Sequence, residues 1–131
     1  MCPDTHGPDV VANLTSGYVH LQNDADYRGY CILVLRRHAV EIHDLTEEER
    51  QQWIEDISRI GHAISGACEP AKLNVTMLGN MVPHLHCHIM PRYPDDPDWG
   101  SPPAYRRPSD RRQLTQDAYD ALHRALSEAL G

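Results

Sequence analysis

The chain has no phenylalanine, and aromatic residues make up only 6% of its 131 residues. No apolar run approaches the ~20 residues that a membrane-spanning helix needs, so we expect no membrane partner. Basic residues are also scarce, since 12 Lys and Arg face 19 Asp and Glu, for a net charge of -7. A protein that coats a nucleic-acid polymer needs a basic excess to neutralise phosphates. We therefore expect no polymer partner, although a small anion can still bind locally.

The sequence also lacks paired cysteines of the C-x-x-C kind. Cys2, Cys31, Cys68 and Cys87 are scattered, and two of them lie in apolar runs typical of strands. This pattern favours buried, reduced thiols over a disulfide framework, and hence a cytoplasmic location. The N-terminus has no basic segment followed by an apolar one, so we predict no signal peptide. Nothing near Cys2 and His6 completes a metal site, and we expect no cofactor.

The length predicts a single domain, residues 1–131, with a loosely ordered lead-in over residues 1–16. Residues 17–24 alternate, with Tyr18, His20 and Gln22 on one side, and residues 31–35 are continuously apolar. Turn-forming residues separate the two runs, so they predict a hairpin. Two further strands, 72–78 and 83–90, are separated by a short turn and should be antiparallel neighbours.

Two helices complete the pattern. Thr46 and Glu49 form a capping box that starts the first, which Gly66 and Pro70 can end. Its apolar stripe is Trp53, Ile54, Ile57, Ile60, Ala63 and Ile64. The second begins near Thr115, with Ala118, Leu122, Ala125, Leu126 and Ala129 on one side, and its small residues predict close packing. The order of elements predicts an α+β domain with a mainly antiparallel sheet. A Pro-rich loop, residues 94–113, is expected to lie near a functional site.

The most informative stretch is "PHLHCHIM", which places His84, His86 and His88 at alternate positions. Side chains alternate across a strand, so we predict that all three imidazoles share one face. Three such histidines are difficult to explain as ordinary surface residues. For the isolated residues His20, His43, His62 and His123, an ordinary structural role is the default.

Two kinds of chemistry fit such a histidine face. A metal could bind two neighbouring imidazoles with a third ligand from another strand. All three could not share one zinc, because His84 and His88 are about 13 Å apart along a strand whereas zinc needs nitrogens within ~2.1 Å. The face could instead hold phosphates, with a central imidazole attacking phosphorus and two flanking donors countering charge. The second interpretation uses all three residues and is the stronger on physical grounds.

The run His84-Leu85-His86-Cys87-His88-Ile89-Met90 resembles the motif of the histidine triad (HIT) family of nucleotide hydrolases and transferases. Upstream, "ILVLRRHAVEIHDLTEEE" and "LQND" are similar to the strand, helix start and ribose-binding position of that family. "MPRY" after the triad resembles the diadenosine polyphosphate hydrolase branch. The resemblance covers residues 18 to 93. It implies a HIT-like fold with a five-stranded antiparallel sheet, two principal helices and a homodimer.

The resemblance also implies roles for individual residues. His86 resembles the nucleophile that attacks the α-phosphate and forms a nucleotidyl-histidine, His88 the residue that contacts that phosphate, and His84 the residue that completes the triad. Asn23 resembles the ribose-binding position, and Asn80 lies where members often place an amide near the phosphates. Asn74 is the alternative to Asn80. No metal ligands are implied.

We therefore expect an enzyme that cleaves at the α-phosphate of a dinucleoside polyphosphate or a nucleoside phosphoramidate. Two alternatives remain open at this point. One is a nucleotide-binding protein that senses without cleaving, and the other is a metalloenzyme that uses an H-x-H pair.

Overall fold

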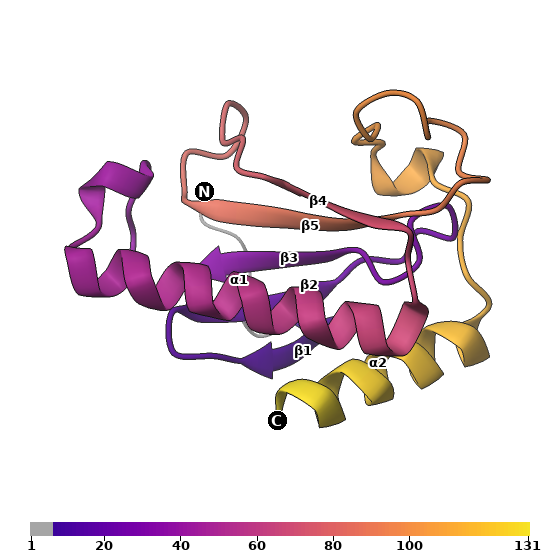
Figure 1. Cartoon of the computed structure of the whole chain (residues 1–131), viewed down its shortest axis with the longest axis horizontal. Coiled ribbons are helices and arrows are strands. Elements are labelled where there is room, and N and C mark those ends of the chain that lie inside the picture. The colour runs from indigo at the N-terminus through magenta and orange to yellow at the C-terminus, as the bar shows by residue number, and fades with distance from the viewer. Residues whose placement is uncertain (1–6) are drawn as a thin grey trace.

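The computed structural model of the chain describes residues 7–131. Its centre is one sheet of five antiparallel strands in the order β1-β2-β3-β5-β4 (Figure 1). The strands are β1 (Val10–Asn13), β2 (Gly17–Leu21), β3 (Cys31–Leu35), β4 (Lys72–Thr76) and β5 (His86–Arg92). The predicted hairpin of β2 and β3 and the antiparallel pairing of β4 with β5 are confirmed.

The helices lie on one side of this sheet. Figure 1 shows α1 (Glu47–Cys68) in front of the sheet, roughly along its strands, and α2 (Gln116–Leu130) beside α1 and β1. Two short 3-10 helices, η1 (Ile42–Asp44) and η2 (Pro108–Asp110), lie in the connections. The α+β fold with its two principal helices is as expected. Within residues 7–131, no helix is both long and apolar enough to cross a membrane.

The main core fills the space between α1 and the sheet. Alternate strand residues point into it, and Trp53 of α1 is completely buried there. The strand contribution consists of Val11, Val19, Leu21, Cys31, Leu33, Leu35, Cys87 and Ile89. The three described cysteines, Cys31, Cys68 and Cys87, are buried and free, as predicted. Cys2 and His6 lie outside the described residues.

Several boundaries differ from the sequence-based expectations. Residues 10–13 were expected in a loosely ordered lead-in, but they form β1 and pair with β2. Helix α1 starts with the predicted capping box at Thr46, yet it continues through Gly66 to Cys68. Glu69 caps its C-terminus in the left-handed conformation (φ 51°). Gly66 is exposed in the last turn of the helix, where a glycine carries only a modest cost.

The apolar stripes of the two helices also need correction. Ile54 was assigned to the buried stripe, but its side chain is 55% exposed. In α2, the buried residues are Leu122, Leu126 and Leu130, whereas the alanines at positions 118, 125 and 129 are exposed. Leucines four residues apart lie on one helix face, and these larger side chains make the contact. The prediction that small residues mediate close packing of α2 was therefore wrong.

Candidate active site

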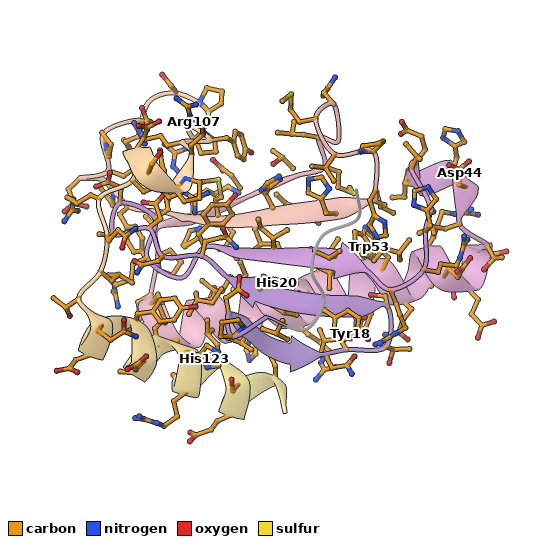
Figure 2. All side chains as sticks on the ribbon, turned by 180° about the vertical axis from the view of Figure 1, so that it is seen from behind. Tyr18, His20, Asp44, Trp53, Arg107 and His123 are labelled. Atoms are coloured by element: carbon orange, nitrogen blue, oxygen red, sulfur yellow. The ribbon has the colours of Figure 1, made fainter. Side chains whose placement is uncertain are left out.

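The face of the sheet away from α1 carries a cavity of about 390 Å³. Figure 2 shows this face, with His20 on β2 and α1 behind the strands. The cavity has apolar and polar walls, and its lining residues are Asp9, His20, Gln22, Ile32, Val34, Val82, His86 and His88. It therefore offers both a surface for a flat apolar group and polar groups that can fix its orientation.

The register of the sheet determines how these side chains are arranged. His20 of β2 is opposite Ile32 of β3, which is opposite His88 of β5. The neighbouring row places Val34 opposite His86. Because directly paired residues point to the same face, each row extends across the sheet from the histidines of β5 toward β2.

His86 is held in a defined tautomer. Its Nδ1 lies 2.7 Å from the main-chain oxygen of His84. A carbonyl oxygen can only accept, so the hydrogen must be on Nδ1 and the neutral ring keeps its lone pair on Nε2. The ring is half-buried and lines the cavity. His86 can therefore present an uncharged nucleophilic nitrogen to a bound group.

His88 is held in the opposite tautomer. The hydroxyl of Tyr30 lies 2.6 Å from Nδ1 of His88. Burial raises the pKa of Tyr30, so its hydroxyl keeps the proton and donates it to this nitrogen. Burial, and secondarily the nearby His86 and Arg111, lowers the pKa of His88 to about 4. At neutral pH His88 is therefore uncharged, and its Nε2–H is a hydrogen-bond donor.

His84 lies just before β5, which begins at His86. Its side chain is buried and does not line the cavity. Its Nε2 donates to the main-chain oxygen of Leu35 at 2.8 Å, and its Nδ1 lies 3.4 Å from Nδ1 of His38. The shared cavity face is thus seen for His86 and His88, and His84 lies just before the strand, outside the cavity lining. This residue acts on the site through its carbonyl, which orients His86.

The Pro-rich segment lies against the same site. The ring of Tyr105 meets that of His88 edge-on, with centroids 4.9 Å apart. Arg111 donates to the side chain of Gln22 at 3.1 Å. The segment is anchored by Arg92, whose guanidinium is buried and forms an ion pair with Asp96 at 2.9 Å. These contacts explain how an irregular segment keeps a fixed position beside His88.

The three asparagines proposed from the sequence lie outside the cavity lining. Asn23 uses its side-chain oxygen to accept from the main-chain N–H of Leu114 at 2.8 Å. Asn74 accepts from Arg92 at 2.7 Å, and Asn80 is exposed in the turn before the triad. The nucleotide-binding roles of Asn23 and Asn80 therefore stay predictions, and neither residue lines this cavity.

Gln22 and His20 line the cavity instead, and both were missed as site residues. Their signal was present in the sequence, because Tyr18, His20 and Gln22 alternate along one face of the predicted strand. Within residues 7–131 there is no group of three or more His, Cys, Asp or Glu side chains that could hold a metal ion.

The sequence matches the HIT domain family over residues 8–95, which includes the triad and every strand. The chain belongs to the HIT family. A histidine triad protein from Bradyrhizobium japonicum has a similar structure, with a TM-score of 0.82 and 32% identity over 93% of this chain and 90% of that one. One from Marinobacter aquaeolei VT8 has a TM-score of 0.81 and 30% identity over 97% of this chain and 89% of that one.

Among curated proteins, "Protein hit" of Bacillus subtilis is 30% identical over 71 residues. That alignment covers 50% of this chain and 49% of the relative, so the match spans about half the length of each. The HIT family includes nucleotide hydrolases and transferases. The geometry of His86 and His88 is thus found in a fold that serves nucleotide chemistry.

Proposed function

We propose that this HIT protein is a nucleotidyl hydrolase or transferase that cleaves at the α-phosphate of a dinucleoside polyphosphate or a nucleoside phosphoramidate. The observation that carries the proposal is the contact between Nδ1 of His86 and the oxygen of His84, 2.7 Å apart. It leaves the Nε2 lone pair of His86 available beside the cavity. Imidazole is a competent nucleophile when it is neutral, and attack by it splits one difficult displacement into two easier ones.

In the first step, Nε2 of His86 attacks the α-phosphorus, and the bond from phosphorus to the leaving oxygen or nitrogen breaks. The leaving group departs with the bonding electron pair and takes up a proton. In the second step water attacks the same phosphorus, the P–N bond to His86 breaks, and the water proton goes to solvent. His88 donates from Nε2–H to a non-bridging oxygen and thereby stabilises the charge that develops in both steps.

The test is turnover by the His86→Asn variant on a panel of dinucleoside polyphosphates and AMP amides. We expect turnover to fall by more than about 10³-fold, because the covalent route is lost, whereas AMP binding stays measurable. The matched control is His43→Asn, since His43 is an exposed residue of η1. Full activity in the His86 variant would remove this residue from the nucleophilic role.

The alternatives give different results in the same assay. A sensor protein would bind nucleotides tightly and release no product from any member of the panel. An H-x-H metalloenzyme would contain a stoichiometric metal in untagged protein and would lose activity with a chelator. Neither alternative makes use of the opposite tautomers of His86 and His88.

We further propose that two copies pair along β4, which is an edge strand of the sheet. In and after β4, Val75, Met77, Leu78 and Met81 are exposed large apolar residues, and Met81 is 93% exposed. An exposed strand edge with apolar side chains favours pairing with another chain. Light scattering should give the mass of a dimer for the natural chain and of a monomer for Val75→Asp. A monomeric natural chain would contradict this proposal.

The free, buried thiols also support the proposal that the protein works in a reducing compartment, the cytoplasm. Microscopy or cell fractionation of the tagged full chain tests the cytoplasmic location.

A further inference from the structure

His20 lies at the end of the cavity opposite the reacting histidine pair. The sheet register places His20 of β2 in one row with Ile32 of β3 and His88 of β5. His20 is therefore two strands away from His88. With a strand spacing near 4.8 Å, His20 and His88 are about 10 Å apart across the sheet. This separation is comparable to the reach of an extended nucleotide from its α-phosphate to the edge of its base.

The imidazole of His20 has an unmet hydrogen-bonding capacity. Its side chain is 9% exposed, and within the described chain its buried Nε2 has no hydrogen-bond partner. Most buried polar side-chain atoms have a partner, because leaving one without a partner is unfavourable. A residue that lines a cavity and lacks such a partner is suited to receive one from a ligand.

Asp9 determines which nitrogen of His20 is available. A carboxylate oxygen of Asp9 lies 3.4 Å from Nδ1. This oxygen can only accept, so it favours the ring proton on Nδ1, and the neutral ring then carries its lone pair on Nε2. The arrangement parallels that of His86, in which an acceptor on Nδ1 also leaves Nε2 unprotonated. At His20, however, the lone pair is far from the phosphate end.

The wall between the two ends is apolar. Ile32 and Val34 of β3 line the cavity between β2 and β5. Their side chains offer a surface on which the face of a flat ring can lie. A ring held there would direct its edge toward β2 and its sugar phosphate toward β5.

We propose that His20 is a specificity-determining residue that accepts a hydrogen bond at Nε2 from an N–H group on the edge of the ligand's nucleobase. The site therefore selects nucleotides whose base carries an amino group at that edge, with adenine as the probe. This inference rests on the proposed function, because it places the α-phosphate at His86 and His88. It adds the chemical feature by which the base is recognised.

The test compares the binding of AMP and purine riboside 5′-monophosphate by calorimetry. The two nucleotides differ by the 6-amino group, and neither needs to be cleaved. We expect the full chain to bind AMP about tenfold more tightly, the effect of one hydrogen bond to a buried acceptor. In His20→Phe, which keeps a ring and removes both nitrogens, the two affinities should become equal.

Two further variants locate the effect. His43→Phe, at an exposed site, should keep the tenfold difference. Asp9→Asn keeps an acceptor for Nδ1–H and should also keep the preference for AMP. If Asp9→Asn abolishes the preference and His20→Phe retains it, Asp9 rather than His20 reads the base, and the proposal is overturned.

The remaining outcomes separate this proposal from the proposed function. Equal affinity of the natural chain for both nucleotides, with turnover intact, overturns the role of His20 alone. A preference for AMP that His20→Phe abolishes, without turnover of any substrate, supports His20 and contradicts catalysis. A chain that binds neither nucleotide contradicts both. If His20→Phe does not fold by circular dichroism, His20→Leu takes its place with the same expectation.

Discussion

The two faces of the central strands differ sharply, although their residues alternate along the same backbone. Toward α1, the side chains of Val19, Leu33 and Cys87 are completely buried and apolar. On the opposite face, His20 and His88 line a cavity. The first face therefore holds the fold together through apolar burial, and the second carries the hydrogen-bonding groups that we assign to chemistry and recognition.

A small domain can thus place polar groups in a shielded site. Polar residues at alternate positions do not interrupt the core, because the pleat directs them to the other face. The division predicts that changes toward α1 act on stability and that changes on the cavity face act on activity.

Replacing Trp53 by alanine should have the largest effect on stability. Trp53 is completely buried between α1 and the sheet, so truncation leaves a cavity in the core. We expect the free energy of unfolding to fall by about 3–5 kcal/mol in urea titrations. Turnover per folded molecule should stay near that of the natural chain. A loss of turnover without a loss of stability would contradict the division between the faces.

Replacing Tyr30 by phenylalanine should act mainly on the chemistry. It removes the hydroxyl that donates to Nδ1 of His88, so this ring is no longer restricted to the tautomer with its hydrogen on Nε2. We expect kcat to fall about tenfold. The matched control is Tyr119→Phe, which removes a hydroxyl bound to the oxygen of Leu21. Equal effects of both variants on kcat would show that the Tyr30 contact has no special role.

The dependence of stability on pH should report the neutral state of His88. Its pKa falls from 6.5 to about 4 on folding, so between these values the unfolded chain binds more protons than the folded one. The contribution of His88 to the free energy of unfolding is thus fully present above pH 6.5 and is lost as the pH falls toward 4. Between pH 7 and pH 6 we expect the free energy of unfolding to fall by less than about 1 kcal/mol through His88.

Urea titrations of the natural chain and of His88→Gln at these pH values check the expectation. The loss should be smaller in His88→Gln and unchanged in His43→Gln. Identical pH dependence in the natural chain and in His88→Gln would contradict the assignment.

Much of the fold could be predicted because its signals are local. The capping box of Thr46 and Glu49 starts α1 where predicted, and the β2–β3 hairpin follows from its turn residues and apolar run. The two alternate histidines of β5 share the cavity face, as period-two alternation predicts. The alternation of His20 and Gln22 was visible as well, but alternation alone does not reveal which strand face forms a cavity.

The remaining features depend on contacts between residues far apart in the sequence. Asn23 accepts at its side-chain oxygen from the backbone N–H of Leu114, 91 residues away, and lies outside the cavity lining. His84 is buried outside the cavity lining, where its ring donates to the main-chain oxygen of Leu35, 49 residues away. Such partners are determined by tertiary structure, and motif spacing does not report them.

Attack of His86 Nε2 on phosphorus forms a covalent intermediate that can be trapped. The full chain is mixed with a substrate labelled at the α-phosphate, quenched under alkaline conditions within one turnover, digested and analysed by mass spectrometry. We predict a nucleotidyl group on His86, absent from His86→Asn and unaffected in His43→Asn. Rapid turnover with no modified His86, or a label of equal amount on another residue in His86→Asn, would contradict the claim.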